Sequence, residues 1–132
     1  MDTTPPPDVP AFLDRYAEAL GAGDLPAIAA CYALPALVVG DAATIPVTEA
    51  AQVEAAFAGA ADAYRAQGLV AIRPELRAVD PLTAILTLVE VRWAYLDEAG
   101  TARRHTSYRY LLRRSDAGRL GIQVVVDTTP QP

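Results

Sequence analysis

Aromatic rings are the side chains of this sequence best able to form a site. The spacing within the expected helices and strands places six of them on inward faces, namely Tyr16, Tyr32, Tyr64, Trp93, Tyr108 and Tyr110. Rings that carry a few hydroxyl groups would form a pocket suited to a flat, mostly apolar ligand. The alternative is that they fill the core and satisfy their hydroxyl groups locally, as buried aromatic residues usually do. We expect the ligand contacts of such a pocket from Tyr16, Tyr32, Phe57, Trp93, Tyr108 and Tyr110.

The other reactive side chains do not predict a site. His105 is the only histidine, and no cysteine or carboxylate cluster lies at the spacing of metal ligands from it. Cys31 has no basic neighbour in sequence, which is typical of a small core residue rather than a nucleophile. The glycine-rich and nucleophile motifs of nucleotide-binding proteins and hydrolases are also missing from the sequence. We therefore expect neither a metal nor a cofactor.

Composition and charge favour a soluble globular protein. A chain of 132 residues that is 52% hydrophobic and 20% charged has the size and composition of one folded domain. Its net charge is −5, and its basic clusters are only Arg103-Arg104 and Arg113-Arg114, so nucleic-acid binding is not expected. No apolar run approaches the ~18 residues that cross a membrane. The first residues do not resemble a secretion signal, so we expect a cytoplasmic protein that does not bind membranes.

The apolar pattern changes along the chain from a helical period to a strand period. Two helices are expected before Pro35, and an apolar stripe with helical spacing predicts a third, long helix over 48–67. Strands are expected over 36–40, 69–79, 83–96, 104–114 and 119–128, and the short turns between the last four predict an antiparallel meander. The sequence thus predicts one α+β domain over 8–128, with a disordered Pro-rich tail over 1–7 and a second tail over 129–132.

Alternation along the strands separates an apolar face from a mixed face. The apolar face carries Val89, Val91, Trp93 and Tyr95 and, from the last strand, Ile122, Val124 and Val126. The mixed face carries Leu86, Leu88, Glu90, Arg92, Arg109 and Arg113. This combination favours a homodimer interface, in which the leucines supply apolar area and the charges fix the register. The alternatives are a solvated face with salt-bridged ladders, or an inverted sheet in which Glu90 and Arg92 line the cavity.

The segment 15–28 resembles the start of the ketosteroid isomerases. It reads Arg-Tyr-Ala-Glu-Ala-Leu-Gly-Ala-Gly-Asp-Leu-Pro-Ala-Ile. The superfamily also contains nuclear-transport-factor-2-like and SnoaL-like domains, and the expected order of helices and strands is similar over about residues 8–128. The resemblance implies a cone: a curved antiparallel sheet wrapped around a long helix, here residues 48–67, with two N-terminal helices and a pocket at the open end. It also implies a homodimer formed through the outer face of the sheet.

The resemblance does not imply ketosteroid isomerase activity for this sequence. Tyr16 matches the tyrosine that donates a hydrogen bond to the substrate oxygen, but Gly40 stands where the family has its catalytic base. Tyr110 stands where the family has a protonated Asp as second donor. We therefore expect a homodimer that binds a small apolar or aromatic ligand without ketosteroid isomerase activity. The alternative is a cyclase, dehydratase or isomerase acting on a polyketide- or terpenoid-like substrate, with Tyr16 as donor and Asp41 as acid/base. Asp41 would face the ligand only if a bulge reversed the strand alternation.

Overall fold

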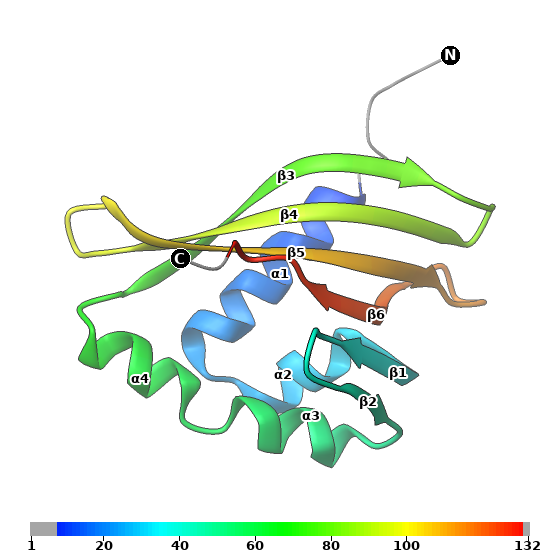
Figure 1. Ribbon diagram of the computed structural model, residues 1–132, viewed down its shortest axis with the longest axis horizontal. Coiled ribbons are helices and arrows are strands. Elements are labelled where there is room, and N and C mark those ends of the chain that lie inside the picture. Colours follow the sequence, from blue (N-terminus) through cyan, green and yellow to red (C-terminus); the bar gives the residue numbers. More distant parts are fainter. Residues whose placement is uncertain (1–7, 131–132) are drawn as a thin grey trace.

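A curved six-stranded sheet lies over a layer of helices in the computed structural model, which describes residues 8–130 (Figure 1). The helices of this part of the chain are α1 (Asp8–Ala22), α2 (Leu25–Ala30), α3 (Ala50–Phe57) and α4 (Ala60–Ala66). The strands are β1 (Tyr32–Val39), β2 (Thr44–Val47), β3 (Ala71–Pro81), β4 (Leu86–Leu96), β5 (Ala102–Arg114) and β6 (Leu120–Asp127). The tail expected over 1–7 lies outside the described residues, as does the end of the tail expected over 129–132. Within residues 8–130, no helix combines the length and the apolar character needed to cross a membrane.

The sheet packs on α1, which lies beneath its middle strands in Figure 1. Val9, Phe12, Leu13 and Tyr16 follow the i, i+3, i+4, i+7 spacing of one helix face, and all four are buried. The chain leaves α1 at Gly23, where φ is +67°. Glycine adopts this left-handed conformation without steric cost, so the helix ends there.

The long helix expected over 48–67 is two short helices. Gly59 has a φ of +82°, which a continuous right-handed helix does not allow, so the chain turns between α3 and α4. Helix α3 begins at a capping box formed by Glu49 and Gln52, not at a cap from Thr48. The curved sheet is confirmed, but the longest helix beneath it is α1 and not a helix over 48–67.

The order of the strands in the sheet is β2-β1-β6-β5-β4-β3. The expected meander is confirmed, because β3, β4, β5 and β6 pair antiparallel in sequence. Strand β1 pairs with β6 in parallel, and the sequence pattern did not predict β2 at the edge. Strand β2 contains Pro46, which an edge strand accommodates because one side of its backbone needs no partner.

The inner face of the sheet follows the predicted alternation along β4 and β5. Val89, Val91, Trp93, Tyr110 and Leu112 are all buried. On β6 the alternation is interrupted, because Leu112 pairs with Ile122 while the preceding residue Leu111 pairs with Val124. This bulge turns Val125 inward, so the prediction of Val124 and Val126 on the inner face was wrong.

Candidate functional site

The six residues predicted as ligand contacts lie around one cavity. The cavity measures about 80 Å³ and is lined by Tyr16, Leu20, Tyr32, Phe57, Tyr64, Trp93, Tyr95, Tyr108, Tyr110 and Val125. These residues come from α1, α3, α4 and four strands, so the cavity lies between the helical layer and the inner face of the sheet. The residues expected to contact a ligand therefore lie together in the fold, and the binding of a ligand there stays a prediction.

Buried rings form the floor of the cavity. Tyr16, Trp93 and Tyr110 are 2%, 2% and 3% exposed. The Tyr16 ring meets Trp93 edge-on at a centroid distance of 5.8 Å and Tyr110 at 6.3 Å. Such edge-to-face contacts are favourable and hold the rings in fixed positions. The floor is thus a rigid, closed surface.

Half-buried side chains form the rim. They are Leu20, Tyr32, Phe57, Tyr64 and Tyr108. Phe57 is the last residue of α3 and Tyr64 lies in α4, so the two sit on either side of the break at Gly59. The cavity therefore opens between the broken helix and the sheet.

Two hydrogen bonds cross the floor. The Trp93 indole Nε1–H donates to the Tyr110 hydroxyl at 2.8 Å, and the hydroxyl oxygens of Tyr16 and Tyr32 are 2.7 Å apart. An indole N–H can only donate, so the Tyr110 oxygen accepts and its own proton finds no acceptor among residues 8–130. In the Tyr16–Tyr32 pair, the hydroxyl that accepts likewise keeps a proton. The Tyr110 hydroxyl at the floor and the Tyr16–Tyr32 pair, which joins the floor to the rim, therefore each offer one hydroxyl proton to a bound molecule.

Five tyrosines of the cavity are neutral at physiological pH, because burial raises their pKa. Burial raises the pKa of Tyr16 and of Tyr110 well above the ordinary value of 10.0. Burial also raises the pKa of Tyr32, Tyr64 and Tyr108 to about 12 in each case. The described lining contains no carboxylate, imidazole, guanidinium or thiol group. These side chains can donate hydrogen bonds, but none of them is a base able to remove a proton from carbon.

The proposed acid/base, Asp41, does not line the cavity. It is exposed in the turn between β1 and β2, where the Gly40 N–H donates to the Ala43 carbonyl at 2.9 Å. Because the strand ends before this turn, no bulge brings the Asp41 side chain inward. The enzyme hypothesis that depended on Asp41 gains no support from this geometry.

Four lining residues were not among the contacts predicted from the sequence. Tyr95 lies two residues after Trp93 on the same face of β4, and Leu20 lies one helical turn after Tyr16. The spacing could therefore have predicted both residues as contacts. Tyr64 was predicted inward but not as a contact. No sequence pattern predicts Val125 as a contact, because the bulge in β6 that turns it inward depends on pairing with β5.

The remaining candidates lie apart from the cavity. His105 is half-buried on β5, opposite Ala94. Cys31 is half-buried after α2 and borders a different groove. Among residues 8–130, no group of three histidine, cysteine or acidic side chains has the geometry to hold a metal ion.

The residues predicted for a dimer interface lie together on the outer face of the sheet. Leu86, Leu88, Glu90 and Arg92 alternate along β4, and Arg109 and Arg113 lie on β5. Glu90 is directly opposite Arg109, and Oε1 of Glu90 lies 3.1 Å from Nη2 of Arg109. A shallow depression of about 610 Å³ contains Leu88, Glu90, Arg109 and Val126. Glu90 and Arg92 therefore face outward, away from the aromatic cavity.

The chain belongs to an NTF2-like family. The family model described as "NTF2-like protein (DUF6841)" matches residues 7–129. This confirms the superfamily that the segment 15–28 indicated. No curated protein is significantly similar to the chain in sequence.

Solved structures with the same fold support this assignment. A domain of unknown function with a cystatin-like fold from Nostoc punctiforme has a TM-score of 0.71 and 18% identity, over 95% of this chain and 76% of that chain. An NTF2-like protein of unknown function from Shewanella oneidensis has a TM-score of 0.66 and 16% identity, over 91% of this chain and 95% of that chain. A ketosteroid isomerase-like protein from Erwinia carotovora atroseptica has a TM-score of 0.60 and 17% identity, over 91% of this chain and 93% of that chain. At such identities the likeness establishes the fold and no activity.

Proposed function

We propose that this protein binds a small, uncharged molecule that combines an apolar ring with a hydrogen-bond acceptor. The observation that carries the proposal is the floor of the aromatic cavity, where Tyr110 accepts from Trp93 and keeps a proton without a partner in residues 8–130. A buried hydroxyl that lacks an acceptor is costly, so a ligand oxygen that accepts this proton is stabilised. The neutral lining of the cavity favours an uncharged ligand over an ion.

The size of the cavity restricts the ligand further. A cavity of about 80 Å³ is smaller than the roughly 150 Å³ that holds one benzene molecule and the roughly 300 Å³ of a small drug pocket. A steroid or polyketide therefore does not fit without movement of the rim. A single six-membered ring needs the smallest movement of the rim, with its acceptor at the floor and its other edge between the rim residues Phe57 and Tyr64.

The same cavity argues against isomerase activity. Proton transfer from a carbon next to a carbonyl needs a base within hydrogen-bond reach, and the lining contains no carboxylate or imidazole that could act as one. Gly40, at the position of the family's base, has no side chain to supply one. We therefore propose a binding function without ketosteroid isomerase activity.

Trp93 makes the proposal testable, because it is the only tryptophan of the chain and lies in the cavity floor. Its indole N–H resonance can be followed by NMR while cyclohexanone is added, with methylenecyclohexane as the matched ring that lacks an acceptor. We expect a saturable shift with cyclohexanone and weaker binding of methylenecyclohexane. Equal binding of the two compounds would contradict a hydrogen bond between the protein and the ligand. The absence of a shift with either compound would refute the whole proposal.

The outer face of the sheet supports a second element of the proposal, a homodimer. It carries apolar side chains such as Leu88 together with both members of the pair Glu90–Arg109, so the same patch on two copies is complementary to itself. The variant Glu90→Arg places a positive charge next to Arg109 and should dissociate the dimer. Sedimentation of the unaltered protein as a monomer at micromolar concentration would contradict this element.

A further inference from the structure

A second concave surface lies where α1, the end of α2 and the start of β6 meet. This groove has a volume of about 540 Å³ and is lined by Phe12, Arg15, Ala27, Ala30, Cys31, Arg119 and Leu120. It shares no lining residue with the aromatic cavity. It is therefore a separate site, and an inference about it does not depend on the proposed function of the cavity.

The base of the groove is apolar. Phe12 and Leu120 are buried and contribute the innermost surface, while Ala27 and Cys31 are half-buried beside them. Small side chains at these positions leave the groove open along the end of α2. Ala27, Ala30 and Cys31 keep surface open to water beside the buried Phe12 and Leu120, and an alkyl chain laid along the groove would cover it.

Two guanidinium groups border this apolar base. The Arg15 guanidinium lies 5.8 Å from the centre of the Phe12 ring, and Arg119 is exposed at the first position before β6. Six other arginines of residues 8–130 form ion pairs with carboxylates, but Arg15 and Arg119 do not, and their side chains donate no hydrogen bond within that part of the chain. No carboxylate borders the groove. Among residues 8–130, neither guanidinium is therefore in contact with a carboxylate, in a protein whose net charge is −5.

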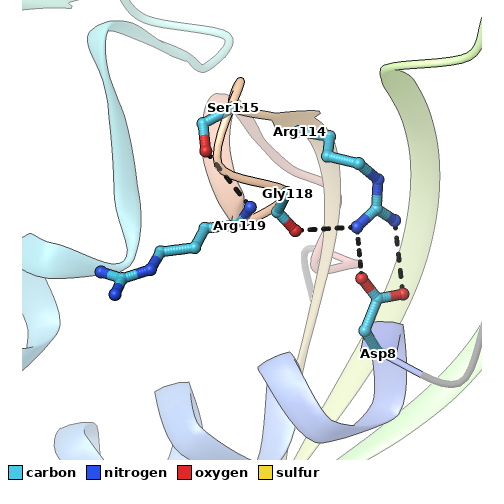
Figure 2. Close-up of polar contacts among 5 residues, drawn as sticks. All are labelled: Asp8, Arg114, Ser115, Gly118 and Arg119. Atoms are coloured by element: carbon cyan, nitrogen blue, oxygen red, sulfur yellow. Dashed lines mark hydrogen bonds and ion pairs between the residues drawn. The ribbon is translucent and has the colours of Figure 1, made fainter.

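Figure 2 shows why Arg119 lacks a carboxylate partner. Arg114 binds both carboxylate oxygens of Asp8 at the start of α1 and also donates to the Gly118 carbonyl at 3.0 Å. The backbone N–H of Arg119 is held by the Ser115 hydroxyl at 3.2 Å, while its side chain extends away from Asp8. The turn is therefore fixed, and the Arg119 guanidinium is directed away from the acid that Arg114 occupies.

We propose that this groove binds a medium-chain organic carboxylate, with the carboxylate between Arg15 and Arg119 and the alkyl chain over Phe12 and Leu120. A planar guanidinium forms charge-assisted hydrogen bonds with a carboxylate, which are stronger than neutral ones. Burial raises the pKa of the Cys31 thiol, and the positive charge of Arg15 partly opposes this rise. Its field therefore extends into the groove.

Cys31 supplies the test, because it is the only cysteine of the chain and lies in the groove. The rate of its alkylation by iodoacetamide, an uncharged reagent, is measured by mass spectrometry with octanoate, octanamide or inorganic phosphate added. We expect octanoate to slow the alkylation in a saturable way, octanamide to do so at about tenfold higher concentration, and phosphate to have no effect. The Nε–H resonances of Arg15 and Arg119 give a second readout, and they should shift on addition of octanoate.

Variants of the two arginines distinguish binding of the carboxylate from binding of the alkyl chain alone. The double variant Arg15→Gln and Arg119→Gln should need about tenfold more octanoate for the same protection of Cys31. The control is Arg77→Gln, because Arg77 is exposed on β3 outside the groove, and this variant should behave like the unaltered protein. Equal protection by octanoate and octanamide, or protection by phosphate alone, overturns the proposal. The proposal is also overturned if octanoate shifts the Trp93 indole resonance but neither slows the alkylation of Cys31 nor shifts the Nε–H resonances of the two arginines. Octanoate would then occupy the aromatic cavity. Failure of cyclohexanone to bind would leave this groove unaffected.

Discussion

The indole Nε1–H of Trp93 donates a hydrogen bond to the hydroxyl of Tyr110 at 2.8 Å, between adjacent strands and under the ring of Tyr16. Both side chains are almost fully buried. The bond satisfies the indole, which has one donor and no acceptor. It also orients the Tyr110 hydroxyl so that its remaining proton is available to a ligand.

Replacing Tyr110 with phenylalanine tests this arrangement. The Tyr110→Phe variant leaves the buried Trp93 N–H without an acceptor, which should lower the free energy of unfolding by about 1–3 kcal/mol. Urea denaturation measures the change. The matched variant is Tyr108→Phe, whose hydroxyl has no hydrogen-bond partner among residues 8–130 and which should change stability by less than about 0.5 kcal/mol. Equal effects of the two variants would contradict the role given to the Trp93–Tyr110 bond.

Alkaline pH should unfold the protein through its tyrosines. Burial raises the pKa of Tyr32, Tyr64 and Tyr108 from 10.0 to about 12, so the neutral form is favoured in the folded state. Their contribution to stability is fully present below about pH 10 and is lost as the pH rises from about 10 to 12. The sequence contains no lysine, so no lysine titration overlaps that of the tyrosines in this range. Ultraviolet absorbance should show tyrosinate forming together with unfolding, whereas ionisation near pH 10 in a folded protein would contradict the burial of these rings.

Two glycines should respond to alanine with opposite signs. Gly59, at a φ of +82°, forms the break between α3 and α4, and Gly59→Ala should destabilise the protein by about 1 kcal/mol. Gly21 lies inside α1 with no atom within 4 Å of an added Cβ, so Gly21→Ala should stabilise by about 0.5–1 kcal/mol. Thermal unfolding of the two variants gives the signs. A stabilising Gly59→Ala would indicate one continuous helix over 48–67.

Asp41 should have no role in the cavity. Asp41→Asn changes an exposed turn residue and should leave the dissociation constant for cyclohexanone unchanged. Tyr16→Phe removes one hydroxyl of the pair at the floor and should weaken cyclohexanone binding about 2- to 10-fold. NMR titration of the Trp93 indole resonance measures both. Weaker binding by the Asp41 variant would reopen the enzyme hypothesis.

The sequence predicted the parts of the cavity that follow local periodicity. Alternation places Trp93 on the inner face of β4 and Tyr108 and Tyr110 on the inner face of β5, and helical spacing places Tyr16 on the buried face of α1. Periodicity predicts the inward-facing residues correctly here because each of these segments buries one face along its length.

The features that periodicity did not predict depend on contacts between distant segments or on one backbone angle. The parallel pairing of β1 with β6 and the bulge that turns Val125 inward arise between residues far apart in the chain. The break at Gly59 depends on a left-handed φ, which a glycine in an otherwise apolar helical stripe permits but does not require. The hydrogen bond between Tyr16 and Tyr32 likewise needs the packed fold before it can be seen.

A crystal structure of the protein grown with cyclohexanone tests the central claim most directly. The account predicts the ring in the aromatic cavity, with its carbonyl oxygen at hydrogen-bond distance from the Tyr110 hydroxyl, about 2.7–2.8 Å. An empty cavity at a cyclohexanone concentration that saturates any binding in solution, or a ring bound elsewhere with Tyr110 unpaired, would contradict it.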